Sequence, residues 1–260
     1  MGDLFADPDP RDIFQFTFHQ STNNNNNNNN SETTGEKNDL TSSSIHVKLS
    51  GYKMENGQIL RSTGLTLWTA SPRLCEYLVT TTTNNNQQHH QATTPIEFIR
   101  NRRVLELGAG LGLCGIVAHK LGAKQVVLTD GDTDTLKEMK QNVEANCRSA
   151  ISASGGIVAE TITCHQLRWG HRLDEFRERH GTFDTILAAD VVYLEEMLHP
   201  LFDTVVKLLD RDRGRFLLSY TRRNVNIDLV LNSARERNFV WMHPEGIEDV
   251  YIMQNKTAMI

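Results

Sequence analysis

Hydrophobic and polar residues alternate with a period of two in two stretches near the N-terminus, residues 13–18 and 45–52. Such alternation is typical of half-buried β-strands. A polar segment separates the two stretches, at about residues 20–43, and it includes a run of asparagines at 23–30. We predict a β-hairpin whose connection carries a long disordered insertion, which is tolerable because the entropy cost of closing a loop grows only logarithmically with its length.

After the hairpin, short apolar runs alternate with stretches of helical periodicity, which predicts strands and helices in turn. In the first helix, within residues 63–78, Ser71 is expected to be the cap, with Pro72 at the first helical position. A second polar low-complexity stretch follows at about 80–94. Beyond it, strands are predicted at 103–107, 125–129, 157–165, 183–189, 214–220, 240–242 and 250–253. Helices are predicted at 113–121, 134–146, 194–209 and 226–238. A loop is predicted at 149–156.

This alternation predicts an α/β fold with a mostly parallel, Rossmann-like sheet of seven strands and helices on both of its faces. The last two strands have no long crossover between them, so they must pair antiparallel or lie beside different neighbours. The predicted organisation is an N-terminal hairpin unit, residues 1–62, and a cofactor-binding domain, residues 63–260.

The strand predicted at 103–107 ends in a glycine-rich turn that indicates a cofactor site. Gly108, Gly110 and Gly112 stand at alternate positions, and the N-terminus of the next helix points back at them. The dinucleotide fingerprint Gly-x-Gly-x-x-Gly would require a third glycine where Leu113 stands. Glu106, at the strand end, would repel a pyrophosphate but suits a cation, which favours S-adenosylmethionine (SAM) with its ammonium and sulfonium groups over a dinucleotide.

The next predicted strand ends at Asp130, roughly 20 residues beyond the glycines, where an acid hydrogen-bonds ribose hydroxyls. Both SAM and NAD carry such a ribose, so Asp130 supports a cofactor site without choosing between them. Asp132 and Asp134 are expected to be the N-cap and a first-turn acid of the following helix. Glu106, Asp130, Trp169 and Asp190 all fall at or near predicted strand ends, which is where open α/β sheets bind ligands.

Composition and charge narrow the classes of protein. The formal net charge is −5 and the pI is near 6.1, so nucleic acid is not the expected partner. The four cysteines have neither disulfide nor zinc spacing, and no metal site is predicted. No apolar run approaches the ~20 residues of a membrane span, and the N-terminus does not resemble a signal peptide. We therefore expect a cytoplasmic protein with reduced cysteines and no membrane partner.

The combination of motifs resembles methyltransferase family 16, the lysine-specific protein methyltransferases with a seven-stranded sheet. The shared segments are GLTLWTA at 64–70, the glycine turn, Thr129-Asp130, LRWG at 167–170 and ADVVYLE at 189–195. Members of this family methylate elongation factors, chaperones or calmodulin. Arg223-Asn224, after the fifth strand of the predicted sheet, resembles the branch that acts on elongation factors. The resemblance implies a SAM-dependent enzyme, with a monomer as the default state.

The resemblance also implies roles for individual residues. Trp68 would pack near the cofactor, Gly108, Ala109 and Gly110 would line its methionine part, and Glu106 would face its cationic groups. Asp130 would bind the ribose, and Trp169 and Ala189 would contact the adenine, for which an aromatic or apolar wall is suitable. Asp190 and Tyr193 would face the lysine amine, with the carboxylate of Asp190 holding and orienting it. The cofactor-binding residues expected in this way are Trp68, Glu106, Gly108, Ala109, Gly110, Asp130, Trp169 and Ala189, and the catalytic residues are Asp190 and Tyr193.

Other functions remain open at this stage. The methylated group could be a histidine, an arginine or a small molecule. An NAD-dependent oxidoreductase is disfavoured by the misplaced third glycine and by Glu106. A protein that binds SAM and only docks on a partner is disfavoured because the motif positions are intact. Trp68 and Trp169 could be core aromatics, and Asp190 could be a helix cap.

Overall fold

The computed structural model describes residues 11–20, 43–53, 62–80, 94–147, 161–221 and 224–256. The Asn-rich insertion (about 20–43), most of the polar stretch (about 80–94), the predicted loop at 149–156 and Arg223 lie outside these ranges. Expectations for those segments are therefore not addressed by the structure.

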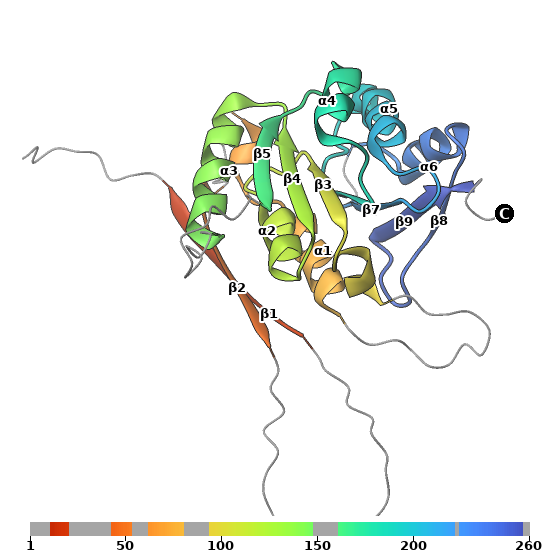
Figure 1. Cartoon of the computed structure of the whole chain (residues 1–260). Helices are drawn as coiled ribbons and strands as arrows, with labels where there is room; N and C mark the ends of the chain where they lie inside the picture. Colours follow the sequence, from red (N-terminus) through yellow and green to blue (C-terminus); the bar gives the residue numbers. More distant parts are fainter. Residues whose placement is uncertain are drawn as a thin grey trace, which may run out of the picture.

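A seven-stranded sheet forms the centre of the protein, as the apolar runs predicted (Figure 1). Its order is β5-β4-β3-β6-β7-β9-β8, and the strands pair in parallel except at β9, which runs antiparallel to both of its neighbours. The last two strands therefore pair with each other and run antiparallel, the first of the two arrangements expected. The strand bounds are β3 Arg103–Leu107, β4 Gln125–Asp130, β5 Ile162–Gln166, β6 Thr185–Ala189, β7 Arg215–Ser219, β8 Phe239–Met242 and β9 Val250–Asn255.

Helices cover both faces of this sheet and divide the core into two halves. One half is built around α1 (Ala70–Val79), α2 (Leu113–Lys120) and α3 (Thr133–Asn146). The other is built around α4 (Leu173–His180), α5 (Leu198–Leu208) and α6 (Ile227–Glu236). Three short 3₁₀ helices complete the described elements: η1 Thr63–Leu65, η2 Pro95–Phe98 and η3 Glu195–Met197.

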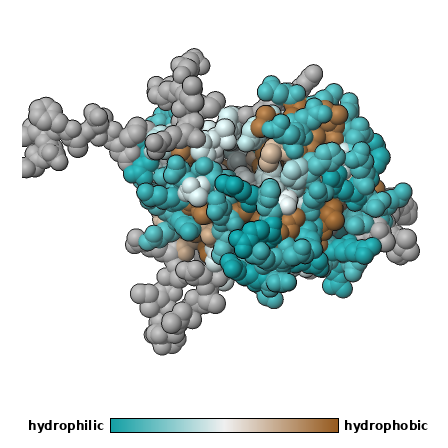
Figure 2. Space-filling model, turned by 90° about the horizontal axis from the view of Figure 1, so that it is seen from above, coloured by the Kyte–Doolittle hydropathy of each residue, from teal (hydrophilic) through white to brown (hydrophobic). Residues whose placement is uncertain are grey.

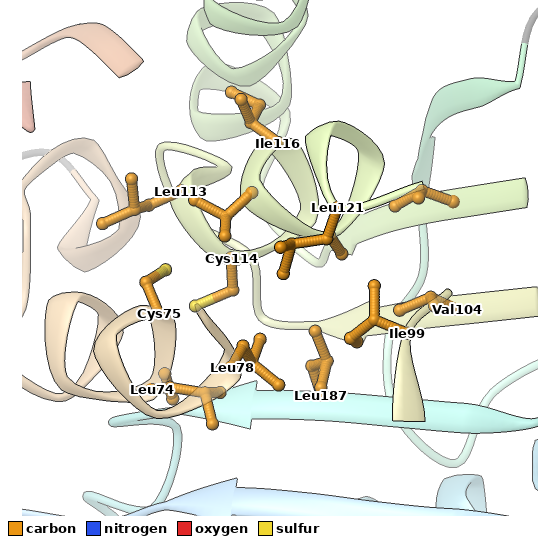
Figure 3. Close-up of a cluster of buried hydrophobic side chains, with 14 of the residues drawn as sticks. Leu74, Cys75, Leu78, Ile99, Val104, Leu113, Cys114, Ile116, Leu121 and Leu187 are labelled. Carbon is orange, nitrogen blue, oxygen red and sulfur yellow. The ribbon is translucent and has the colours of Figure 1, made fainter. Parts of the chain in front are cut away.

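The core between α1, α2 and the sheet consists of aliphatic side chains and two thiols (Figure 3). Cys75 of α1 and Cys114 of α2 are fully buried, and their sulfur atoms point toward each other between the two helices. None of the four cysteines, all of which lie in the described ranges, forms a disulfide. Burial raises the pKa of Cys75. The pKa of Cys114 is raised by the hydrogen bond between the two thiols and by burial. Both thiols therefore stay protonated at neutral pH.

The predicted N-terminal hairpin is present as β1 (Asp12–His19) and β2 (Ser44–Gly51), paired antiparallel over their full lengths. Its buried side chains Phe18, Val47 and Leu49 belong to the same core as α1 to α3. The hairpin lies against α2 and α3 rather than extending the central sheet (Figure 1). It therefore shares the hydrophobic core of the cofactor domain.

Helix α1 begins earlier than predicted, and the expectation of a Ser71 cap is wrong. The N-cap position is Thr69, whose side chain makes no capping hydrogen bond. The amide of Ala70 instead donates to the carboxylate of Asp190, 120 positions away, at 2.9 Å. By contrast, Asp132 caps α3 as predicted, since its side chain accepts from the amide of Thr135 at 2.8 Å.

The described surface is mostly polar. On the face in Figure 2, hydrophilic residues predominate and hydrophobic residues form smaller patches between them. The large apolar side chains that are exposed come from separate elements and from the loop after β6: Ile13, Tyr193, Leu194, Val206, Leu229 and Met242. Within the described ranges, no helix has both the length and the apolar character required to cross a membrane.

Candidate active site

The predicted site residues gather where the order of the parallel strands reverses. From β3 the chain passes to β4 on one side, whereas β6, on the other side of β3, is followed by β7. The carboxyl ends of β3 and β6 therefore open into the crevice that α/β proteins use for ligands. The glycine loop follows β3 at this edge, and Asp190 directly follows β6.

The glycine loop has a backbone that favours glycine at three positions. Gly108, Gly110 and Gly112 have φ angles of 64°, 54° and 89°, in the left-handed region. The amide of Ala109 donates to the carbonyl of Thr129 at 2.9 Å, and that of Gly112 donates to the carbonyl of Ala109 at 2.8 Å. The loop is thus a tight turn tied to β4, and it leads directly into the N-terminus of α2.

Close contacts from three other segments surround this loop. A Cβ atom added at Gly108 would lie 2.8 Å from Val191 Cγ1 and 3.2 Å from the ring of Trp169. One added at Gly110 would lie 3.2 Å from the carbonyl oxygen of Gly64. The glycines are therefore required both by the backbone conformation and by the segments that pack against the loop.

Asp130 lies beside the loop, half-buried at the end of β4. Its carboxylate accepts hydrogen bonds from the amides of Gly110 at 3.2 Å and Asp132 at 3.0 Å. Burial raises the pKa of Asp130, and these amide hydrogen bonds partly offset that effect. The amide of Gly131 also interacts with it, and because a carboxylate has about four acceptor positions, Asp130 keeps capacity for a ribose hydroxyl.

Glu106 lies beneath the loop rather than on its open side. It is 2% exposed, and its carboxyl accepts the amide of Gly115 in the first turn of α2 at 2.7 Å. Burial raises its pKa to about 8, so the group is largely protonated at neutral pH. The structure thus gives Glu106 a direct contact with the start of α2, while its expected contact with a cofactor cation stays a prediction.

The two predicted tryptophans approach the loop in different ways. The half-buried ring of Trp169 lies directly against Gly108. The indole of Trp68, also half-buried, donates to the carbonyl of Thr63 at 2.8 Å and thereby braces η1, whose Gly64 contacts Gly110. Trp169 thus lies at the loop itself and Trp68 is bonded to η1, while the expected contacts of both rings with a cofactor stay predictions.

Asp190 connects three segments around the crevice. It is 7% exposed and has a left-handed backbone with φ of 57°, and its amide donates to the carbonyl of Ser219 at 3.0 Å. One carboxylate oxygen accepts the amide of Ala70 at the start of α1, and the other accepts that of Thr221 at 3.2 Å. Asp190 therefore joins the end of β6 to α1 and to the segment after β7.

The remaining predicted residues complete the edge of the crevice. Ala109 and Ala189 are buried at the ends of β3 and β6, and neither presents a polar side chain there. Tyr193, three residues after Asp190, is 36% exposed. A tyrosine side chain with this exposure is accessible to an incoming side chain.

Reasoning from sequence missed two contributors to this edge. Val191 packs against Gly108, and no local signal marks that contact. Gly64 was noticed as part of a motif, but its backbone approach to Gly110 and its contact with Thr135 were not predicted. Both contacts join segments that are distant in sequence, which is why residue patterns do not reveal them.

The donors and acceptors at this edge fit SAM. The start of α2 offers its amides, Asp130 offers acceptors suited to a ribose, and the ring of Trp169 offers a flat surface suited to an adenine. These features lie around one loop, so a single elongated ligand can contact all of them.

Comparisons with known proteins identify the family of this chain. Residues 52–242 match the family model described as lysine methyltransferase. The protein N-lysine methyltransferase METTL21A of Xenopus tropicalis is 33% identical over 182 residues, covering 69% of this chain and 72% of that protein. The METTL21A protein of Danio rerio is 30% identical over 216 residues, covering 82% and 87% of the two chains.

A solved structure shares the fold. SMU.776, described as a methyltransferase and solved as a complex with SAH, has a TM-score of 0.55 and 11% identity, covering 80% of this chain and 53% of that one. At this identity the match supports the fold, while the family follows from the match over residues 52–242. The chain therefore belongs to the lysine methyltransferase family, and it is an enzyme whose cofactor is S-adenosylmethionine.

Proposed function

We propose that the protein transfers a methyl group from SAM to a lysine side chain of an elongation factor or a chaperone. The observation that carries the proposal is the convergence, at one edge of the sheet, of the glycine loop, Asp130 and the Asp190–Tyr193 segment. Membership in the lysine methyltransferase family supports the same reaction. The two METTL21A relatives carry the name protein N-lysine methyltransferase, which supports a protein as the source of the lysine.

In this proposal the cofactor lies along the glycine loop. Gly108, Ala109 and Gly110 line its methionine part, and Asp130 accepts from its ribose. Trp169 and Ala189 contact the adenine. Trp68 contributes by bracing η1 against the loop, as its hydrogen bond to Thr63 supports. Glu106 acts from beneath the loop, where its contact with Gly115 supports an effect on the start of α2.

The chemistry requires a neutral amine aligned with a reactive methyl group. SAM supplies a methyl group on a positively charged sulfur, which makes it susceptible to attack by nitrogen. The protein must bind the lysine in its neutral form, and apolar walls favour that form because they disfavour the ammonium ion. Val191 and Ala189 are buried apolar side chains at the end of β6 and beside Asp190. Alignment of nitrogen, carbon and sulfur is then the main demand on the site.

Asp190 and Tyr193 are proposed to orient the amine. Two backbone amides occupy acceptor positions on the Asp190 carboxylate and hold it at the crevice. A carboxylate is an acceptor suited to the hydrogens of an amine. Tyr193 lies closer to solvent and would contribute its hydroxyl group to the same amine or form a wall of the lysine channel.

Tyr193→Phe is the cleanest test of the site because this side chain is exposed and its hydroxyl can be removed without disturbing the core. We expect methyl transfer at saturating SAM to fall about tenfold, in line with the loss of one positioning hydrogen bond, while the SAM dissociation constant stays within twofold. Unchanged transfer would remove the Tyr193 hydroxyl from the reaction and leave only its ring as a wall of the channel. A parallel loss of SAM binding would assign Tyr193 to the cofactor site instead.

The substrate is tested with purified proteins. Elongation factors and chaperones from the same cells would be incubated with the enzyme and radiolabelled SAM, with calmodulin as the comparison, and the labelled residue would be identified by mass spectrometry. Methyl-lysine in an elongation factor or a chaperone supports the proposal. Label only in calmodulin, or only in a small-molecule fraction, would contradict it.

We also propose that the enzyme acts as a monomer in the cytoplasm. Two fully buried, protonated thiols, those of Cys75 and Cys114, support a reducing compartment. Fluorescence microscopy of the tagged full chain, together with light scattering of the purified protein, tests both statements.

A further inference from the structure

The side chain of Asn142, on α3, is hydrogen-bonded both to the N-terminal hairpin and to the cofactor loop. This side chain is 2% exposed and makes three hydrogen bonds. Its Oδ1 accepts the amide of Ser50 in β2 at 2.8 Å, and its Nδ2 donates to the carbonyl of Ser50 at 3.0 Å. The same Nδ2 also donates to the carbonyl of Leu111, inside the glycine loop, at 3.2 Å.

The orientation of this amide is fixed by its partners. The group that faces two carbonyl oxygens must be the NH₂, and the group that faces an N–H must be the oxygen. Both hydrogens of Nδ2 and one acceptor position of Oδ1 are therefore used. A buried side-chain amide that makes this many hydrogen bonds holds its neighbours in one arrangement.

Leu111 is the residue between Gly110 and Gly112, the two left-handed glycines at the end of the loop. Its carbonyl is held by Asn142, and the amide on the other side of the same peptide bond, that of Gly112, donates to Ala109. The peptide plane between Leu111 and Gly112 is thus held from both sides. Because Gly112 adjoins this plane and a glycine tolerates a wide range of φ angles, the plane would otherwise rotate easily.

The hairpin supports the loop at the same place by packing. A Cβ atom added at Gly51, the last residue of β2, would lie 2.5 Å from Leu111 Cδ1. The end of β2 and the Leu111 side chain are therefore in close contact, so displacement of the hairpin would free the loop from both restraints.

A second asparagine on α3 provides a natural comparison. Asn146, one turn further along, accepts the amide of Lys48 at 3.0 Å and donates to the carbonyl of Lys48 at 2.7 Å. It therefore holds β2 in the same way as Asn142 does. The side chain of Asn146 bonds to β2 and to the carbonyl of Asn142 within α3, whereas the side chain of Asn142 also bonds to the glycine loop.

We propose that Asn142 is a positioning residue for SAM binding, which holds the Leu111 carbonyl and so makes the N-terminal hairpin part of the cofactor site. The inference rests on SAM as the cofactor and is independent of the substrate proposed above. Without the bond from Asn142, the peptide plane after Leu111 would sample orientations that do not match SAM. The affinity for SAM would then fall in proportion to the fraction of molecules whose loop has the matching orientation.

The test compares Asn142→Ala with Asn146→Ala in the full chain. SAM and its demethylated product SAH are titrated into each purified variant by calorimetry. We expect the dissociation constants to rise about tenfold for Asn142→Ala, the loss that goes with leaving one buried carbonyl without its donor, and to stay within about twofold for Asn146→Ala. Hydrogen exchange of the Gly112 amide should accelerate in the first variant only.

Activity gives a third readout. The KM for SAM should rise in Asn142→Ala, while kcat at saturating SAM stays near the wild-type value. If Asn142→Ala does not fold, Asn142→Ser, which retains a small polar side chain, carries the same expectation. Equal affinity losses in the Asn142 and Asn146 variants, or no loss in either, would overturn the proposal. Methyl transfer to an unexpected substrate would leave it intact, because binding of SAM is measured directly.

Discussion

The carboxyl group of Glu106 is buried, and its pKa lies near neutral pH. Its pKa is raised from 4.5 to about 8 by burial. Between these values the folded protein holds one more proton than the unfolded chain, so the free energy of unfolding falls as the pH rises. The stability contributed by the neutral acid is complete near pH 4.5 and is lost progressively up to about pH 8.

Glu106→Gln should remove this pH dependence, because an amide cannot ionise and its oxygen still accepts the amide of Gly115. Across the window from pH 5 to pH 8, the unfolding free energy of the wild type should fall relative to that of the variant by up to roughly 1.4 kcal/mol per pH unit. Urea unfolding of both cofactor-free proteins at several pH values measures the difference. Parallel pH profiles would contradict the burial argument.

Gly110 has a left-handed backbone, and a side chain added there would face the carbonyl of Gly64. We expect Gly110→Ala to cost about 1–2 kcal/mol of stability and to weaken SAM binding at least tenfold. Gly122→Ala is the matched control, since Gly122 has φ of 89° but its added Cβ would meet only Arg100, at 3.9 Å, far from the loop.

Gly122→Ala should therefore lose comparable stability and keep its affinity for SAM. Thermal unfolding and calorimetric titration of both variants separate the two effects. Loss of SAM binding in both variants would mean that general strain, rather than the shape of the glycine loop, controls the affinity.

Helix α1 depends on a partner that is distant in sequence. Its first amide is bonded by Asp190, a buried carboxylate that also accepts from Thr221. Anions near a helix N-terminus are stabilising, and hydrogen bonds that involve a charged acceptor are stronger than neutral ones. Loss of the Asp190 carboxylate should therefore loosen the contacts among three segments: the start of α1, the end of β6 and the segment after β7.

Asp190→Ala should lower the unfolding free energy by about 2–3 kcal/mol, because two amides lose a buried charged acceptor. Asp249→Ala is the comparison, since Asp249 forms an ion pair with Arg73 of the same helix but is partly exposed. That pair should contribute less than about 1 kcal/mol. Chemical denaturation of both variants gives the two values, and equal losses would contradict the capping role of Asp190.

The elements that sequence patterns predicted well are those with continuous apolar runs. The bounds of β3 were predicted correctly because Val104, Leu105 and Leu107 are apolar and the glycine turn follows at once. Helix α4 was not predicted, since Phe176 is its only buried residue and charged side chains occupy most other positions. The helix predicted at 194–209 is a 3₁₀ turn followed by α5, which starts at Leu198.

The same division applies to the candidate site. The glycine turn and Asp130 were predicted because each is marked by local sequence next to a strand end. The approach of Val191 to Gly108, the cap supplied by Asp190 and the three bonds of Asn142 join segments far apart in the chain. Such contacts depend on how the elements pack, and one sequence does not contain a pattern for them.

In the whole molecule, the hairpin and the domain share one core. Leu49 of β2 is fully buried in the cluster that also contains α1, α2 and α3. Leu49→Ala should therefore cost about 2–5 kcal/mol of global stability in a single unfolding transition. Ile13→Ala, on the same hairpin but 50% exposed, should cost less than about 0.5 kcal/mol. A separate low-temperature transition in the first variant would instead mean that the hairpin unfolds independently.

The first measurement on the intact enzyme should be methyl transfer itself. The purified protein is incubated with radiolabelled SAM and a lysate of its own cells, and the labelled proteins are hydrolysed and analysed by mass spectrometry. We predict that the label appears as Nε-methyl-lysine in one or a few proteins and is absent when SAH is added in excess. Label in arginine or histidine alone, or no protein label from an enzyme that binds SAM, would contradict protein-lysine methylation.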